Sequence, residues 1–234
     1  MSQILNIEDL FVTYQDGTSA LRGVGLTVLP GQRVGLIGPN GAGKTSLMLA
    51  VMRSVPFTGR IMVDGVELSR RTTDEVRSRC GMTFQDPDDQ LFMPTLLDDV
   101  AFGPLNQGDS PTAAEAKALH AIAMVGLEGL QGRCAHHFSG GQKRNAALAT
   151  ILSMQIKLLM LDEPGANLDA RCRRRMIDTL HGRQEAMLLA THDLLMIGEL
   201  CDRVIVLDNG QVVANGASCD ILDDSDLLAA HGLA

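Results

Sequence analysis

Short apolar runs separated by glycine, asparagine, aspartate and proline occupy the first part of the chain. Residues 4–7, 10–14, 25–28 and 33–37 each have the length and the β-branched or aromatic content of a strand. The run 44–52 instead carries its apolar residues at helical spacing, and a proline and a glycine follow it. The pattern predicts several strands, then a glycine-rich loop, then a helix.

Two tight turns are predicted by their dipeptides. Asp64-Gly65 and Asn209-Gly210 each separate two short apolar runs. Such pairs accept the positive φ angles that a two-residue hairpin needs. We therefore expect a β-hairpin at each place.

The middle of the chain has a different character. Four prolines between residues 87 and 111 divide it into short acidic pieces, and residues 112–125 follow an alanine-rich helical pattern. Apolar strands return at 157–161, 186–190 and 204–207 with helical stretches between them, as in a parallel sheet covered on both faces. The fold class is therefore α/β with a mostly helical insertion, and a short amphipathic helix is expected from residue 220.

The composition fits a folded globular protein. The 234 residues are 45% hydrophobic and 21% charged, which excludes wholesale disorder, and the net charge of −8 argues against a basic face for nucleic acid. Five scattered cysteines form no C-x-x-C pair, so they predict buried thiols in a reducing compartment. No export signal begins the sequence, and its longest apolar stretch, 146–161, is too polar to span a bilayer.

The strongest chemical motif lies between the predicted strand 33–37 and the predicted helix. Residues 38–45 read Gly-Pro-Asn-Gly-Ala-Gly-Lys-Thr, which satisfies G-x-x-x-x-G-K-[ST] in full. Glycines let the backbone wrap a phosphate closely, Lys44 reaches the β- and γ-oxygens, and the Thr45 hydroxyl ligates Mg²⁺. The alternative, a glycine-rich turn with a surface lysine, explains only part of the motif.

Two carboxylates follow the apolar strand near residue 161. Asp162 and Glu163 lie at its C-terminal end, where α/β sheets bind ligands. Asp162 is suited to hold Mg²⁺, and Glu163 is suited to take a proton from attacking water. The alternative is an acidic cap on the next helix.

A third motif opens an alanine-rich helix that runs to about residue 153. Residues 139–143 read Ser-Gly-Gly-Gln-Lys, and Ser139 with Gln142 also fits a capping box. Two consecutive glycines cost about 1 kcal/mol each relative to alanine inside a helix. The sequence therefore leaves two interpretations open, a well-capped helix and a second phosphate-binding surface.

Together these motifs resemble the nucleotide-binding subunit of ATP-binding cassette (ABC) transporters over nearly the whole chain. The resemblance implies that the Ser-Gly-Gly-Gln signature of one subunit covers the ATP held by the phosphate loop of the other, in a head-to-tail dimer. It also implies that Tyr14 stacks on adenine, that Gln85 contacts Mg²⁺ and water, that Asp169 ends a loop across the dimer, and that His192 contacts the γ-phosphate.

The resemblance gives one set of site residues for ATP and Mg²⁺. The expected catalytic residues are Glu163, His192 and Gln85, and the expected Mg²⁺ ligands are Thr45, Gln85 and Asp162. The expected ATP-binding residues are Tyr14, Gly38, Pro39, Asn40, Gly41, Ala42, Gly43, Lys44, Thr45, Ser46, Ser139, Gly140, Gly141, Gln142 and Asp169.

The same resemblance predicts a P-loop NTPase (RecA-like) core with a parallel sheet, an N-terminal antiparallel β subdomain and a helical insertion. It divides a single ABC ATPase domain, 1–234, into a nucleotide-binding core (1–85 and 156–219), a helical signature subdomain (86–155) and a short tail (220–234). Asn145 departs from the family, because arginine is usual at its place in the signature helix.

A narrower resemblance, to the ATPase of energy-coupling-factor (ECF) importers, rests on residues 84–92 and 99–106. It implies ATP-driven uptake of cobalt, nickel or a vitamin such as biotin. The partners would be a second copy or a homologous ATPase and transmembrane ECF-type subunits. The protein would be cytoplasmic and peripheral on the inner membrane face, held there only through those partners.

The acidic loop with Leu91, Phe92 and Met93 exposed is expected to receive a helix with basic residues, and a flexible connector is its alternative. Two other functions stay open at this point. One is an ABC ATPase acting outside transport, and the other is a non-catalytic ATP-gated scaffold.

Overall fold

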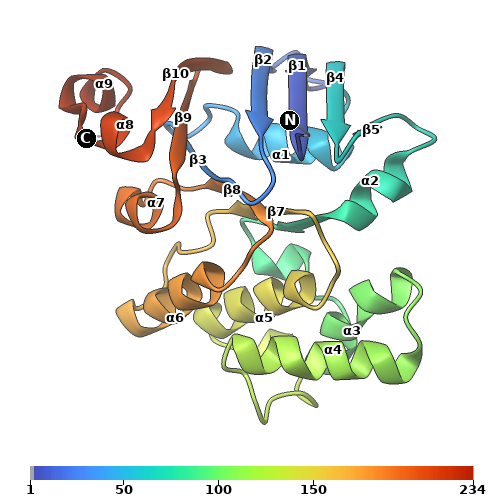
Figure 1. Cartoon of the computed structure of the whole chain (residues 1–234). Helices are drawn as coiled ribbons and strands as arrows, with labels where there is room; N and C mark the ends of the chain where they lie inside the picture. The colour runs from blue at the N-terminus through green and yellow to red at the C-terminus, as the bar shows by residue number, and fades with distance from the viewer. Residues whose placement is uncertain (1–2, 234) are drawn as a thin grey trace. The chain divides into compact units, whose positions relative to one another are not determined.

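The computed structural model describes residues 3–233, and the chain divides into two compact units (Figure 1). Unit 1 contains the chain up to Cys80, Lys157–Glu163 and the chain from Gln184 onward. Unit 2 contains Gly81–Ile156 and Pro164–Arg183. The chain thus leaves unit 1 and returns to it twice.

An antiparallel sheet in unit 1 has the strand order β2-β1-β4-β5. Its strands are β1 (Leu5–Thr13), β2 (Ser19–Val28), β4 (Thr58–Val63) and β5 (Val66–Glu67). The two strands expected at 4–7 and 10–14 are one strand, with a register shift between Ile7 and Leu10 around Asp9, whose φ is +48°. The Asp64-Gly65 hairpin between β4 and β5 is confirmed.

A second sheet carries the buried core of unit 1. Within this unit its order is β10-β9-β3-β8-β7, and β9, β3, β8 and β7 run parallel while β10 returns antiparallel to β9. The strands are β3 (Arg33–Ile37), β7 (Leu158–Asp162), β8 (Ala186–Ala190), β9 (Arg203–Asp208) and β10 (Gln211–Ala217). β7 and β8 are buried at every residue, as their unbroken apolar sequences predict.

Five helices belong to unit 1, namely α1 (Lys44–Val51), α2 (Thr73–Arg79), α7 (Leu194–Leu200), α8 (Ser218–Asp223) and α9 (Ser225–Ala230). α1 packs on β7 and α7 packs on β3. The single helix expected from residue 220 is two short helices, because Asp224 ends α8 and caps α9 by accepting the Leu227 amide at 2.9 Å. α2 has no apolar stripe, since Val76 is its one buried residue, and the pattern did not predict it.

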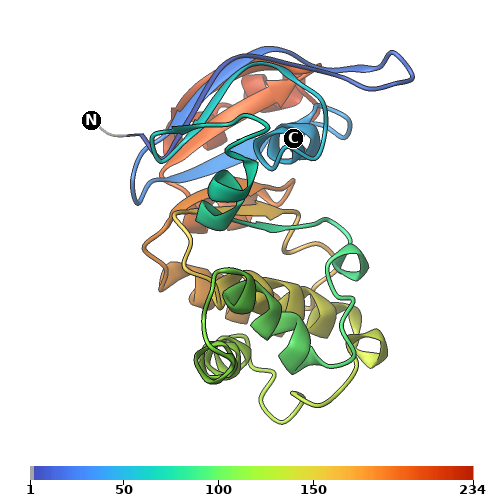
Figure 2. The same cartoon turned by 90° about the vertical axis from the view of Figure 1, so that its right-hand side faces the viewer.

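Unit 2 begins within β6 (Cys80–Thr83) and is otherwise mostly helical (Figure 2). It contains two 3₁₀ turns, η1 (Pro87–Asp89) and η2 (Ala135–His137), and the helices α3 (Leu96–Asn106), α4 (Pro111–Met124), α5 (Gly140–Leu152) and α6 (Ala170–His181). α3, α4 and α5 pack on one another.

α3 contains Pro104 in its interior, which is why the sequence did not predict a helix there. Proline has no N–H, so the carbonyl four residues earlier, that of Val100, lacks its usual helical donor. The Ser153 hydroxyl donates to this carbonyl at 2.8 Å and is itself buried. A side chain from the end of α5 thus replaces the bond that the proline removes.

The expected α/β fold class is therefore confirmed, with a parallel core, an antiparallel N-terminal sheet and a helical unit. The compact units differ from the expected functional division in one stretch, because Pro164–Arg183, which includes α6, groups with unit 2. The functional division itself remains a prediction.

Candidate functional site

The glycine-rich loop 38–45 connects β3 to α1 and is shaped by the backbone around it. Gly43 has a φ of +106°, and a Cβ on it would lie 2.6 Å from the Ala20 carbonyl oxygen of β2. A Cβ on Gly38 would collide with the Leu207 carbonyl of β9. Gly41, with a φ of +80°, has no atom within 4 Å of such a Cβ and faces open space. Only glycine fits the two close positions.

The first turn of α1 leaves its backbone amides available. The helical ladder reaches Gly43 through the Leu47 amide at 2.9 Å, so the amides that precede Leu47 at this end have no helical acceptor. A helix N-terminus of this kind favours anions through its unpaired N–H groups and its dipole. The loop and α1 together therefore form an anion-binding concavity.

Lys44 closes the loop on itself. The residue is 8% exposed, and its ammonium donates to the Gly38 carbonyl at 2.6 Å and the Pro39 carbonyl at 3.0 Å. Burial lowers the pKa of Lys44, while Glu163 and Asp162 act in the opposite direction. The cation thus lies in a partly dry site beside two carboxylates.

Asp162, the last residue of β7, accepts a hydrogen bond from the Thr45 hydroxyl at 2.7 Å. Asp162 is 1% exposed, and burial raises its pKa, opposed by that hydrogen bond. These two oxygen donors are the chemistry that Mg²⁺ prefers, and a buried carboxylate of this kind is stabilised by a nearby cation. The residues present therefore fit a bound Mg²⁺.

Glu163 follows in a left-handed conformation, with a φ of +48°, and is buried. Its carboxylate accepts the Thr191 hydroxyl at 3.0 Å and the His192 amide at 3.1 Å, and its Oε2 lies 2.9 Å from Nδ1 of His192. The three contacts named here come from Thr191 and His192, the two residues that follow β8.

Thr191 is a residue that motif reasoning missed. It is 1% exposed, and its hydroxyl donates to Glu163 and accepts from the Asp193 backbone amide at 3.1 Å. The signal was present in the sequence, because a polar residue directly after the buried strand β8 must find a partner.

Tyr14 belongs to the turn that follows β1. Its hydroxyl lies 2.9 Å from the Ser46 hydroxyl of α1, and its ring is partly exposed. The structure thus brings Tyr14, the loop with Lys44 and Thr45, the pair Asp162 and Glu163, and His192 into unit 1.

The remaining expected site residues, Gln85, Ser139–Gln142 and Asp169, belong to unit 2. Ser139 and Gln142 form the capping box, with the Gln142 amide donating to Ser139 Oγ at 3.3 Å and the Ser139 amide donating to Gln142 Oε1 at 3.0 Å. Gly140 has open space around it, whereas a Cβ on Gly141 would lie 3.4 Å from Leu168. The capped-helix interpretation is confirmed, and it leaves Gly140 accessible.

Gln85 and Asp169 are both exposed. The Gln85 carbonyl accepts from the Arg144 guanidinium at 3.2 Å. Asp169 caps α6 by accepting the Cys172 amide at 2.8 Å, and this bond lowers the pKa of Asp169.

The loop expected to expose three apolar residues differs from that prediction. Leu91 is buried at 3% exposure, Met93 is partly covered, and Phe92 is exposed at 62%. Two acids of this loop have partners within unit 2, because Asp86 caps η1 and Asp88 pairs with Lys143 of α5 at 2.7 Å. Three consecutive apolar residues give no periodicity, so the sequence could not show which of their side chains points inward.

Side chains of α5 and α6 hold the C-terminal end of α4. The Met124 carbonyl accepts from Thr179 at 3.2 Å, the Val125 carbonyl from Asn145 at 3.0 Å, and the Gly126 carbonyl from Arg175 at 3.4 Å. Asn145, unusual for its place in the signature helix, is therefore a buried donor to α4.

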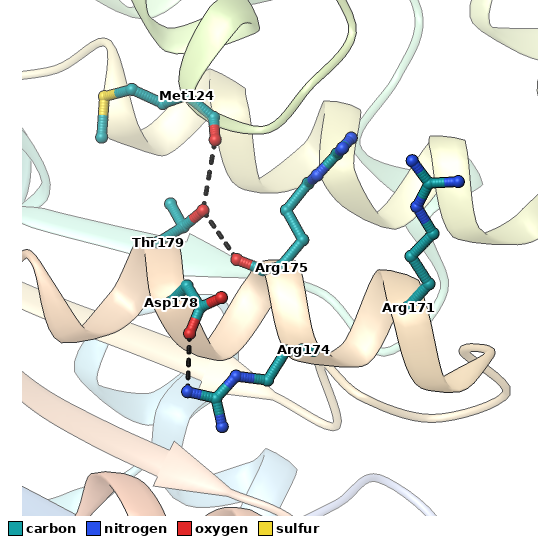
Figure 3. A pocket seen from close by; sticks show the side chains of 6 residues that line it. All are labelled: Met124, Arg171, Arg174, Arg175, Asp178 and Thr179. Atoms are coloured by element: carbon teal, nitrogen blue, oxygen red, sulfur yellow. Dashed lines mark hydrogen bonds and ion pairs between the residues drawn. The ribbon is translucent and has the colours of Figure 1, made fainter.

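Arginines line a cavity of about 610 Å³ beside this end of α4 (Figure 3). Arg171 and Arg175 extend on the same side of α6, while Arg174 turns toward Asp178 and pairs with it at 2.8 Å. The cavity lies entirely within unit 2.

Comparison with known proteins places the fold and the site in one family. Residues 21–166 match the ABC transporter family. A putative ABC transporter ATP-binding protein of Gloeobacter violaceus is 46% identical over 100% of this chain and 97% of its own length. The chain belongs to the ABC transporter family.

Two of the relatives indicate which type of ABC transporter this chain resembles. The energy-coupling factor transporter ATP-binding protein EcfA of Methanocaldococcus jannaschii is 36% identical over 96% of this chain and 83% of its own. The structure of CbiO1 from Clostridium perfringens, described as part of the ABC transporter complex CbiONQ, is 31% identical with a TM-score of 0.83 and covers 100% of this chain and 96% of that one.

The chain is therefore an ABC ATPase, and its resemblance to the ATP-binding subunits of ECF-type transporters is confirmed. In the described part of the chain, none of the helices has the length and hydropathy that a membrane span requires.

Proposed function

We propose that this protein is the ATP-hydrolysing subunit of an ECF-type importer that takes up cobalt, nickel or a vitamin through partner membrane proteins. One observation carries the proposal. Unit 1 gathers a phosphate-binding loop with its lysine, an oxygen pair suited to Mg²⁺ and a buried glutamate beside a histidine at the ends of adjacent strands. The named transporter relatives support the coupling to transport.

ATP binding rests on the loop and α1. Lys44 exchanges its two carbonyl partners for the β- and γ-phosphate oxygens, and the free amides of the loop and of the first α1 turn donate to the same phosphates. Tyr14 stacks on adenine, and the loop residues Pro39, Asn40 and Ala42, with Ser46 of α1, shape the remaining contact. Each exchanged contact then joins the ammonium to an anionic oxygen instead of a neutral carbonyl.

Thr45 and Asp162 would hold Mg²⁺, and the family resemblance adds Gln85 as a further ligand. Mg²⁺, when bound, neutralises charge that develops on the phosphate oxygens. Glu163 accepts the proton of the attacking water, and Thr191 and His192 keep its carboxylate in place until then. His192, at 68% side-chain exposure, is free to contact the γ-phosphate.

Two copies, or this chain and a homologous ATPase, form a head-to-tail dimer in which residues 139–142 and Asp169 of one subunit complete the site of the other. The accessible Gly140 and the amides of the α5 N-terminus support this role. The whole chain acts as one ABC ATPase domain, with 86–155 as its signature subdomain. It lies in the cytoplasm on the inner membrane face through its transmembrane partners.

The experiment is ATP hydrolysis by the purified chain, alone and with the transmembrane subunit that copurifies with it. We expect slow hydrolysis alone and stimulation with that subunit, because the subunit holds two copies at high effective concentration. An absence of stimulation by every copurifying membrane protein would contradict the importer role.

The acidic loop that contains Asp86, Asp88 and Asp89 offers a more specific test by mutation. Asp89 is exposed and makes no ion pair among the described residues, whereas Asp88 pairs with Lys143, so Asp89→Lys tests surface charge without breaking α5 contacts. We expect weaker complex formation and weaker stimulation. Asp74→Lys, an exposed acid of α2, is the matched control. Full assembly of Asp89→Lys would make the loop acid irrelevant to docking.

A further inference from the structure

Asp99 is a buried carboxylate that the proposed chemistry does not use. It lies on the inward face of α3 and is 3% exposed. One oxygen, Oδ1, accepts the backbone amides of Phe92 at 3.0 Å and Met93 at 2.9 Å. The other, Oδ2, is buried with no hydrogen-bond partner among the described residues. Burial raises the pKa of Asp99, and the two amides act in the opposite direction.

A half-satisfied buried carboxylate costs free energy that an apolar residue at the same place would not. Its neighbours on the inward face of α3, Leu96 and Val100, are apolar and fully buried. The Asp99 side chain forms both of its hydrogen bonds with one short piece of backbone, residues 92–93. The gain that offsets the cost must therefore lie in the conformation of that piece.

The backbone that Asp99 holds carries an exposed aromatic side chain. Phe92 is 62% exposed, and its ring meets Phe102 edge to face, with centroids 5.2 Å apart and planes at 86°. Phe102 and Leu105, one helical turn apart on the outward face of α3, are 42% and 44% exposed. We call Phe92, Phe102 and Leu105 the aromatic platform.

We propose that Asp99 is a positioning residue that fixes the Phe92–Met93 backbone and so presents the aromatic platform, in one arrangement, to the apolar face of an amphipathic helix of the transmembrane partner. This rests on the proposed function, which supplies such a partner. The exposed carboxylates of Asp86 and Asp89 on the same loop select a helix whose flanks are basic.

Asp99 preorganises the Phe92–Met93 backbone for docking. A free loop would lose conformational entropy when the partner orders it. The two hydrogen bonds from backbone amides to the Asp99 carboxylate order the loop before the partner docks, so less entropy is lost on docking. Asp99 touches neither nucleotide nor partner, and acts through the place it gives Phe92.

The test compares three variants of the full chain. Asp99→Leu removes both acceptors, and Asp99→Asn keeps one acceptor oxygen of the same shape. Ser153→Ala is the matched control, since Ser153 is another buried polar residue that bonds to α3, through the Val100 carbonyl rather than the loop. Hydrogen exchange is measured under native conditions on peptides that contain residues 92 and 93.

We expect Asp99→Leu to speed exchange of these two amides at least about tenfold, since each bond to a charged group is worth roughly 1.5–3 kcal/mol. Asp99→Asn restores most of the protection, and Ser153→Ala leaves it unchanged even if global stability falls. Equal exchange in Asp99→Leu and Ser153→Ala would overturn the positioning role.

A second readout uses Phe92→Trp, because the chain has no other tryptophan. In this background, we expect Asp99→Leu to increase acrylamide quenching of the tryptophan and to weaken binding to the detergent-solubilised transmembrane subunit that copurifies with the chain. ATP affinity reports on the nucleotide site separately, so failure of the proposed function is distinguishable from failure at Asp99. Unchanged quenching and unchanged partner affinity would remove Asp99 from docking.

Discussion

The nucleotide site of unit 1 and the signature turn of unit 2 use their polar residues in opposite ways. In unit 1 the expected site residues bond to one another across the chain, as Thr45 does with Asp162 and Glu163 with His192. In unit 2 the side chains of Ser139 and Gln142 each accept a hydrogen bond from the other residue's backbone N–H, three residues apart. The difference teaches that the fold itself brings the residues of unit 1 together, whereas the signature turn is a capped helix end, and we propose that it acts beside a second subunit.

Glu163→Gln is expected to cause the largest loss of ATP turnover, and it acts in the nucleotide site of unit 1. Gln keeps the shape but not the base, so ATP still binds while turnover falls about 10²- to 10⁴-fold, and the closed dimer accumulates. Phosphate release measures turnover, and size-exclusion chromatography with ATP detects the dimer. Hydrolysis at the wild-type rate would support the scaffold function, which needs no base.

Ser139→Arg tests the other half of the site. The arginine blocks the surface offered to the neighbouring subunit, so turnover falls roughly 10²- to 10³-fold, as on loss of a charge-stabilising donor, while the monomer still binds ATP. Ser139→Ala is the control, because it removes the same cap bond, worth about 1 kcal/mol, without the block. Loss of ATP binding by the Ser139→Arg monomer would contradict a shared site.

Lys44→Ala removes the cation of the phosphate loop and is expected to weaken ATP binding roughly 10- to 100-fold, from charge-assisted bonds of about 1.5–3 kcal/mol. Titration with a fluorescent ATP analogue measures the affinity. Lys143→Ala, which breaks only the pair with Asp88, should leave the affinity unchanged. An unaltered affinity in Lys44→Ala would exclude the loop from phosphate binding.

The smallest effect is a pH dependence at Asp99 in unit 2. Its folded pKa lies above the ordinary value of 3.8, so as pH rises the unfolded chain releases its proton first, and wild-type stability falls relative to Asp99→Asn. Asp98 adds to the upward shift and His136 opposes it. Urea unfolding from about pH 4 to about pH 8 should show the stability difference opening and then staying constant. A constant difference throughout would contradict the shift.

The sequence predicted the strands of the parallel sheet because β7 and β8 are uninterrupted apolar runs, and it predicted the loop 38–45 because the motif is local. It could not predict α3, whose interior Pro104 leaves the Val100 carbonyl to accept from Ser153, 53 residues beyond Val100 in the chain. Nor could it show that Leu91 points inward while Phe92 points out. Such features depend on side chains that meet only after folding.

The glycines of the phosphate loop have a consequence for recombination between relatives. Gly38 and Gly43 press against the carbonyls of Leu207 and Ala20, and the Gly210 amide donates to the Ala42 carbonyl at 3.1 Å. Strand β2 and the β9–β10 hairpin thus constrain the backbone conformation of the loop, although neither belongs to the motif. In a chimera of two such ATPases, the loop should keep its shape only when the loop, β2 and the β9–β10 hairpin all come from the same parent.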